Sequence, residues 1–197
     1  KAKAKVSSAV QDIADDLIKL YAKREAEKGF AFSPDSDEQR NFEDGFPYEE
    51  TEDQLRSIIE VKRDMERERP MDRLVCGDVG YGKTEVAIRI AMKTVLNNKQ
   101  VAFLAPTTIL TRQHYQTFLN RFQKYGVRVE LINRLISKKD QKRIIEDVKK
   151  GLVDILIGTH AILEENVVFK NLGLVVTDEQ HRFGVRQRST IVSKGNN

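Results

Sequence analysis

The residues best suited to chemistry form a glycine-rich loop with the pattern Gly-x-x-x-x-Gly-Lys-Thr. Its glycines carry no Cβ, so the backbone N–H groups can turn inward around phosphate oxygens. Lys83 can reach the outer phosphates of a nucleotide, and the Thr84 hydroxyl is a suitable ligand for Mg²⁺. The loop therefore predicts a nucleotide phosphate site made of Gly77, Asp78, Val79, Gly80, Tyr81, Gly82, Lys83, Thr84 and Glu85.

A pair of carboxylates, Asp178 and Glu179, follows the apolar run 172–176 after a single residue, Thr177. We expect Asp178 to hold Mg²⁺, directly or through water, and Glu179 to orient or deprotonate the water that attacks the γ-phosphate. The alternative is a solvated acidic turn, which is common after a strand. The presence of a phosphate loop in the same chain favours the catalytic interpretation.

Apolar runs that alternate with helical segments would position both groups. The phosphate loop lies between the run 74–76 and a helical segment at 85–96. Further strand-like runs are 101–105, 127–132, 153–157 and 172–176, and further helical segments are 107–124 and 137–150. This alternation predicts an α/β fold with a parallel sheet covered by helices on both faces. Strand carboxyl ends line the ligand crevice in such sheets, so the acids should face the phosphate loop.

Two helical segments precede this sheet. The first is amphipathic and runs from Val6 to Lys28, where Gly29 ends it; it can pack on the following domain or act as a rigid connector from an upstream one. The second begins at Thr51, whose spacing from Gln54 is that of a capping box. Between them, residues 30–50 read as loop with a short polar helix.

Composition limits the remaining possibilities. The 197 residues are 40% hydrophobic and carry a net charge of +4, which fits one globular domain with an appendage. A nucleic-acid surface must then be a local patch. The single cysteine, Cys76, cannot form an internal disulfide and is expected to be a buried apolar residue. No apolar run is long enough for a transmembrane helix. We expect the chain to be a piece of a longer cytoplasmic protein.

The phosphate loop and Asp178-Glu179-Gln180-His181 together resemble motifs I and II of the second helicase superfamily, in its Asp-Glu-x-His branch. The segments 105–108, 158–160 and 178–185 are similar to the first motor lobe shared by two families, the bacterial transcription-repair coupling factors and the branch-migrating fork helicases. The lead-in segments 12–22, 29–35 and 46–54 favour the coupling factors. Gln180 departs from the Glu commoner in coupling factors and matches the fork helicases.

The resemblance covers essentially the whole chain and implies a RecA-like P-loop NTPase fold. It implies that Phe46 stacks on adenine and that Gln54 hydrogen-bonds its edge, while the helix cap remains the alternative for Gln54. His181 would couple the nucleotide site to the DNA side. The residues implied to contact the DNA backbone are Pro106, Thr107, Thr108, Arg134, Gly158, Thr159 and His160.

The implied activity is that of a DNA-dependent ATPase that uses ATP and Mg²⁺ to move along double-stranded DNA. Residues 1–29 would connect to an upstream domain, and residues 30–197 would form the first RecA-like lobe. A second RecA-like lobe would supply an arginine finger, so the isolated lobe should be nearly inactive. The implied partners are RNA polymerase and the damage-recognition protein of excision repair, in the nucleoid-associated cytoplasm of a bacterium.

Three other functions remain open. A fork-remodelling helicase would bind branched junctions instead of RNA polymerase. A small-molecule kinase or GTPase would share the phosphate loop, but the segment closest to a guanine-reading Asn-Lys-x-Asp motif, residues 97–100, lacks the aspartate. An ATP-binding module without turnover is the third.

Overall fold

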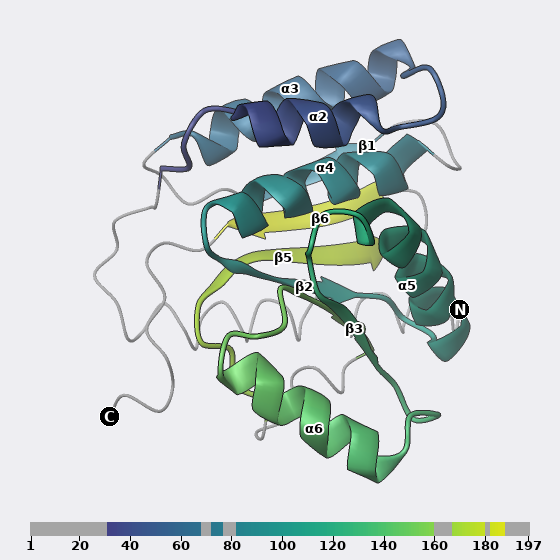
Figure 1. Ribbon diagram of the computed structural model, residues 1–197. Coiled ribbons are helices and arrows are strands. Elements are labelled where there is room, and N and C mark those ends of the chain that lie inside the picture. Colours follow the sequence, from purple (N-terminus) through teal and green to yellow (C-terminus); the bar gives the residue numbers. More distant parts are fainter. Residues whose placement is uncertain (1–30, 68–71, 77–81, 160–166, 180–181, 188–197) are drawn as a thin grey trace.

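The computed structural model describes residues 31–67, 72–76, 82–159, 167–179 and 182–187. These residues form a mixed six-stranded sheet with helices on both faces (Figure 1). The predicted N-terminal helix, most of the phosphate loop, His160 and His181 lie outside the described residues.

The sheet contains five strands that run in the same direction and one that runs against them. Its strands are β1 (Asp72–Cys76), β2 (Gln100–Leu104), β3 (Val129–Ile132), β4 (Ile155–Gly158), β5 (Leu172–Glu179) and β6 (Arg182–Gln187), in the spatial order β1-β6-β5-β2-β4-β3. β5, β2, β4 and β3 pair in parallel. β6 is antiparallel to both β5 and β1, so β1 also points the same way as the parallel strands.

Strand β6 is absent from the sequence prediction. Only two residues separate the end of β5 from the start of β6, a connection of hairpin length. Apolar residues occupy every second position of its sequence, at Phe183 and Val185, with Arg182, Gly184 and Arg186 between and around them. This is the period-two pattern of a strand. The strand pairs antiparallel with both of its neighbours, so the sheet is mixed rather than wholly parallel as predicted.

Four of the five described helices begin where the sequence supplies a capping side chain. They are α2 (Asp37–Asp44), α3 (Glu52–Met65), α4 (Gly82–Leu96), α5 (Thr108–Phe122) and α6 (Lys138–Lys149). The side chains of Ser36, Thr51, Thr107 and Ser137 each accept a hydrogen bond from a backbone N–H three residues ahead. Such a cap typically stabilises a helix by about 1 kcal/mol.

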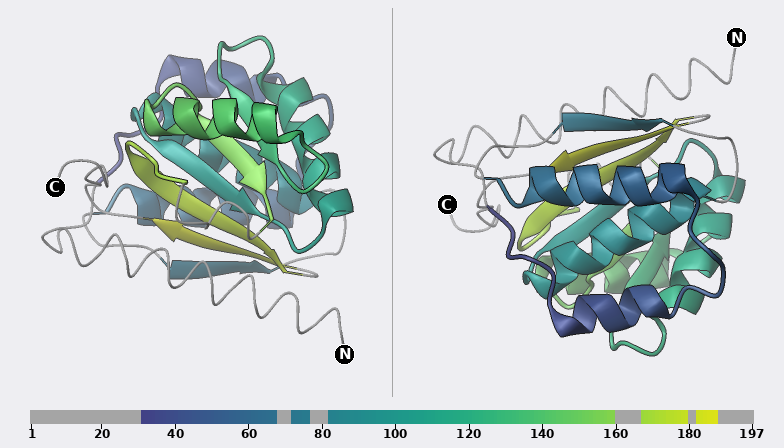
Figure 2. Two further views of the ribbon diagram at one scale, coloured as in Figure 1. Left: turned by 90° about the horizontal axis from the view of Figure 1, so that it is seen from below. Right: turned by 90° about the horizontal axis from the view of Figure 1, so that it is seen from above.

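Two apolar clusters cover the two faces of the sheet. Val101 and Phe103 of β2 pack with α2, α3, α4 and α5 on one face, whereas Ala102 and Leu104 pack with α6 on the other. The alternation follows the two-residue period of a strand. Figure 2 shows α6 on the opposite side of the sheet from α2, α3 and α4. Within the described ranges, no helix is long and apolar enough to cross a membrane.

Candidate functional site

The carboxyl ends of β1 and β5 lie at the same edge of the sheet. Cys76, the last residue of β1, pairs with Arg182 of β6, and Arg182 pairs in turn with Glu179, the last residue of β5. The two strand ends are therefore two strand spacings apart, about 10 Å. The phosphate-loop sequence starts directly after Cys76, so the topology brings it to the edge where the acid pair lies.

The strands that precede the predicted DNA-contact residues end at the same edge. Leu104 of β2 pairs with Gly158 of β4, and Gly158 pairs with Ile132 of β3. Each of these strand ends leads into one of the predicted DNA-side segments, at 106–108, 134 and 158–160. The strand order thus places the nucleotide motifs and the DNA motifs on neighbouring halves of one edge.

The helix that follows the phosphate loop begins at Gly82, so Lys83 and Thr84 lie in its first turn. Lys83 is buried, and Thr84 is half-buried. A helix N-terminus presents unpaired N–H groups and a partial positive charge, which attract a phosphate. Residues 77–81 of the predicted loop lie outside the described residues, so their contribution stays a prediction.

Asp178 contacts a histidine that no motif singles out. Its Oδ2 lies 2.7 Å from Nε2 of His114, a residue of α5. The two side chains are 15% and 12% exposed, respectively. The histidine is 64 residues away in the sequence, so spacing alone offers no signal for this contact. Glu179 is the last residue of β5. Its side chain lies outside the described part of the structure.

The capping box predicted at the start of α3 is confirmed. The Thr51 hydroxyl accepts from the Gln54 backbone N–H at 3.1 Å, and the Gln54 Oε1 accepts from the Thr51 backbone N–H at 2.8 Å. The Gln54 side chain is buried. The contact of Gln54 with adenine stays a prediction.

Phe46, the predicted adenine-stacking residue, is half-buried and surrounded by aromatic and cationic groups. Its ring meets the Tyr48 ring edge-on, with 5.7 Å between centroids. The guanidinium carbon of Arg89 lies 5.3 Å from the Phe46 centroid, and that of Arg121 lies 6.0 Å away. These distances allow cation–π attraction, which would hold the ring in place.

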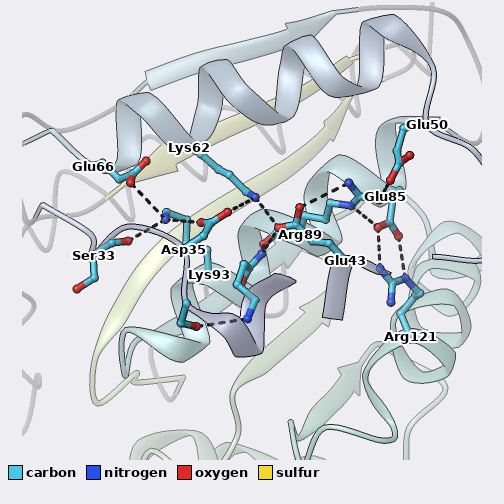
Figure 3. Close-up of polar contacts among 12 residues, drawn as sticks. Ser33, Asp35, Glu43, Glu50, Lys62, Glu66, Glu85, Arg89, Lys93 and Arg121 are labelled. Atoms are coloured by element: carbon cyan, nitrogen blue, oxygen red, sulfur yellow. Dashed lines mark hydrogen bonds and ion pairs between the residues drawn. The ribbon is translucent and has the colours of Figure 1, made fainter. Parts of the chain in front are cut away.

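The helix after the phosphate loop carries a buried charged stripe, drawn in Figure 3. Glu85, Arg89 and Lys93 are spaced four residues apart and share one face of α4. Arg89 and Lys93 are each only 2% exposed. The sequence signal is a charged residue at every fourth position of an otherwise apolar helix, which indicates partners on the helices packed against it.

Each charge in the stripe has a partner from a different segment. Arg89 donates to Glu85 at 2.6 Å and to Glu50 at 2.8 Å. Lys93 donates to Asp35 Oδ1 and to the Ser33 carbonyl, both at 2.8 Å. The stripe therefore ties the loop before α2 and the loop before α3 to α4.

Arg121 of α5 completes the network through a bidentate contact with Glu85. Its Nε donates to Oε1 at 2.9 Å, and its Nη2 donates to Oε2 at 2.7 Å. Its Nη1 also donates to the Phe42 carbonyl of α2 at 3.1 Å. Planar Arg–carboxylate pairs of this kind fix geometry as well as charge. Arg121 thus holds α2, α4 and α5 together beside Phe46.

The network shifts the ionisation of its members. Burial raises the pKa of Asp35, but hydrogen bonds from Lys62 and Lys93 outweigh burial and hold the pKa below its usual value. Burial lowers the pKa of Arg89, but hydrogen bonds to Glu50 and Glu85 outweigh burial and raise the pKa overall. Both groups are therefore charged at neutral pH.

On the DNA side, the structure shows which predicted residues face solvent. Thr107 is exposed and caps α5, with its hydroxyl accepting from the Leu110 N–H at 3.1 Å. Arg134 is exposed in the loop after β3. The neighbouring Asn133 is buried and accepts from the Leu135 N–H at 2.9 Å, which shapes the loop that carries Arg134.

The other described members of the predicted DNA-contact set are less open. Pro106, Thr108 and Thr159 are half-buried, and Gly158 is buried as the last residue of β4. Exposed contact atoms on this side are therefore concentrated on Thr107 and Arg134. The role of the whole set stays a prediction.

Comparison with known proteins gives consistent matches. Residues 51–195 match the DEAD/DEAH box helicase family. The chain is 61% identical over 191 residues to the transcription-repair-coupling factor of Bacillus subtilis (strain 168), and 56% identical over the same length to that of Staphylococcus haemolyticus (strain JCSC1435). Each alignment covers 97% of this chain but only 16% of the relative. The chain therefore spans about a sixth of the length of these proteins.

A solved structure of RecG bound to a three-way DNA junction shares the fold, with a TM-score of 0.73 and 35% identity. The match covers 91% of this chain and 24% of that one. This likeness confirms the predicted RecA-like fold, and the high identity to coupling factors confirms the resemblance drawn from the sequence. Membership in this family implies nucleotide binding in general. The chain belongs to the DEAD/DEAH box helicase family.

Proposed function

We propose that this chain is the ATP-binding lobe of an ATP-driven translocase of double-stranded DNA. One observation carries the proposal: the strand register aligns the end of β1, which leads into the phosphate loop, with the end of β5, which bears the acid pair. Ligands of α/β sheets bind at this edge. The family membership and the RecG-like fold support a motor on DNA over other uses of a phosphate loop.

In this proposal the nucleotide lies across the edge formed by β1 and β5. The backbone of residues 77–82 and the N-terminus of α4 hold the phosphates, and Lys83 neutralises the outer two. Glu179 orients the attacking water, and His181 connects the nucleotide to the DNA side. Phe46 stacks on adenine, and Gln54 bonds its edge.

Thr84 and Asp178 would hold Mg²⁺. The donor set fits this ion, since a hydroxyl and a carboxylate are hard oxygen ligands and Mg²⁺ takes its remaining ligands from phosphate and water. No group of three or more acidic, histidine or cysteine side chains in the described part of the chain could hold a metal by itself. A bound Mg²⁺ would neutralise charge that develops on the phosphate oxygens.

The DNA backbone would run along the other half of the edge. Thr107 and Arg134 present exposed polar atoms there, and the N-terminus of α5 adds free N–H groups. Pro106, Thr108, Gly158, Thr159 and His160 complete the proposed contact set. Phosphate contacts of this kind position a protein without reading sequence.

The activity of the whole protein is a wider proposal, because the chain spans 16% of its relatives' length. We propose a second lobe with an arginine finger, displacement of stalled RNA polymerase at DNA lesions, and recruitment of the excision-repair damage-recognition protein in the bacterial cytoplasm. A second candidate, remodelling of branched DNA, is favoured by the fold shared with RecG on a three-way junction. Preference of the longer protein for junctions over linear duplex, without co-precipitation of RNA polymerase, would favour this second candidate.

Nucleotide binding by residues 1–197 tests the core of the proposal. Calorimetric titration with Mg-ATP should give measurable, weak binding that Lys83→Ala abolishes, because the phosphates lose their cation. Lys124→Ala, at an exposed lysine after α5, is the matched control and should bind like the wild type. Absence of binding by the wild type, or equal binding by the Lys83 variant, would refute the proposed site.

A further inference from the structure

His114 connects helix α5 to the acid pair at the end of β5. Its Nε2 lies 2.7 Å from Oδ2 of Asp178. Both side chains are largely buried, at 12% and 15% exposed. A hydrogen bond between two largely buried groups from separate elements favours a defined orientation of both, because water has limited access to compete for either partner.

The direction of this hydrogen bond follows from the chemistry of its partners. An ionised carboxylate only accepts, so the imidazole Nε2–H must donate to Asp178. A carboxylate has about four acceptor sites on two oxygens. The bond to Oδ2 therefore leaves Oδ1 able to face a cation or a cation-bound water.

The imidazole is itself held in place by packing. Its ring centroid lies 4.7 Å from that of Phe103 on β2. Phe103 also meets Phe118, one turn further along α5, edge-on at 5.2 Å between centroids. Both phenylalanines are fully buried. The donor is thus fixed by a rigid core, which is what a group that orients another side chain requires.

We propose that His114 is a positioning residue that holds Asp178 in the orientation in which its carboxylate binds Mg²⁺ with the nucleotide. The inference rests on the proposed function, since Asp178 is the proposed metal ligand. Hydrogen-bond partners of metal-binding carboxylates contribute to metal affinity by fixing the ligand before the ion arrives. His114 is not among the residues proposed to contact the nucleotide, so its effect should be confined to the dependence on Mg²⁺.

Two substitutions separate the hydrogen bond from the packing. His114→Phe keeps an aromatic ring against Phe103 but removes the donor. His114→Gln restores an N–H donor at a similar reach, because the glutamine amide carries two donors. Phe118→Leu is the matched control, since it removes another aromatic contact of the Phe103 ring but leaves the bond between His114 and Asp178 intact.

The measurement is the affinity of residues 1–197 for a fluorescent ADP, in EDTA and at increasing Mg²⁺ concentration, with thermal unfolding of each variant alongside. In the wild type, ADP affinity should increase as Mg²⁺ is added. The Mg²⁺ concentration that gives half of this increase should be about tenfold higher or more in His114→Phe. The affinity for ADP in EDTA should not change. His114→Gln should recover much of the loss, and Phe118→Leu should show the wild-type Mg²⁺ dependence even if it melts earlier.

The possible failures are distinguishable. If wild-type ADP affinity rises with Mg²⁺ and His114→Phe responds identically, the positioning role is refuted and the proposed function stands. If Phe118→Leu reproduces the His114→Phe defect, the effect is packing and the positioning role is also refuted. A wild type that binds no ADP, or binds it with no response to Mg²⁺, refutes the proposed metal site and the inference with it.

Discussion

The Gln54 side chain caps helix α3 and is also the proposed reader of adenine. Its Oε1 accepts from the Thr51 N–H, and its amide group also carries two N–H donors. We expect Gln54→Ala to lower the free energy of unfolding by about 1 kcal/mol through the lost cap. We also expect ATP affinity to fall more than GTP affinity, because only adenine offers the edge that the amide would read.

Thr51→Ala is the control for this prediction. It removes the other half of the same capping box, the Thr51 hydroxyl that accepts from the Gln54 N–H, and leaves the amide in place. It should cost similar stability without changing the ratio of ATP to GTP affinity. The adenine role of Gln54 is wrong if Gln54→Ala also leaves that ratio unchanged.

Asp35 should make stability depend on acid pH. Lys62 and Lys93 donate to its two oxygens at 2.6 and 2.8 Å and, against burial, hold its pKa below the usual value. Because the folded pKa is the lower one, the stabilisation is complete above the unfolded pKa of about 3.9 and is lost as pH falls through the folded value. The free-energy difference between wild type and Asp35→Asn should therefore shrink from about pH 7 to about pH 3.

Urea unfolding at the two pH values measures this difference. Asp37→Asn, at an exposed carboxylate of the same segment, controls for the general loss of one negative charge. A difference for Asp35→Asn that stays constant or grows with acidity would show that the two lysine contacts do not stabilise the ionised carboxylate.

At the residue scale, the sequence predicted groups that belong to motifs and missed groups defined only by contact. The capping box, the Cys76 strand and the acid pair at a strand end follow from local patterns. His114 and Arg121 do not, because their partners, Asp178 and Glu85, are distant in the sequence. Without a fold, a lone histidine or arginine on a helix has no preferred partner.

Among the helices, α4 contributes both to the apolar core and to the buried ion pairs. Arg89→Met should destabilise the protein by about 3–5 kcal/mol, because it leaves the buried carboxylate of Glu85, and the partly exposed carboxylate of Glu50, with fewer partners. Arg40→Met is the matched control. Arg40 makes an ion pair with Asp37 of the same 2.8 Å length, but its side chain is 66% exposed, so the cost should be about 0–1 kcal/mol.

Denaturant unfolding of the two variants gives the comparison directly. Equal costs for Arg89→Met and Arg40→Met would mean that burial does not set the strength of this network. A large cost confined to Arg89 would show that the segments around Phe46 depend on α4 for their position.

Element prediction succeeded where periodicity was strong. The segments predicted at 107–124 and 137–150 form α5 and α6 with slightly shorter bounds, and the apolar runs form β2, β3, β4 and β5. Strand β6 was missed because its six residues contain two arginines and a glycine, and its pairing with β1 and β5 depends on the tertiary fold. The insertion of β6 between β1 and β5 could not be deduced from patterns along the chain.

At the scale of the whole molecule, the sheet orders the proposed functions along one edge. The strand order places the nucleotide motifs by β1 and β5 and the DNA motifs by β2, β4 and β3. A lobe built this way would leave one side of its bound nucleotide exposed. An arginine finger from a second lobe typically raises the rate of hydrolysis about 10³–10⁵-fold. Residues 1–197 should therefore bind nucleotide but hydrolyse it near background.

Steady-state phosphate release, with and without double-stranded DNA, tests whether hydrolysis needs a second lobe. It is measured for residues 1–197 and for the proposed longer protein, with Glu179→Gln as the blank in each. We predict background release by residues 1–197 whether or not DNA is present, and DNA-stimulated release by the longer protein that Glu179→Gln abolishes. DNA-stimulated release by residues 1–197 alone would show that one lobe suffices, and a longer protein whose hydrolysis does not respond to DNA would show that it is not a DNA-driven motor.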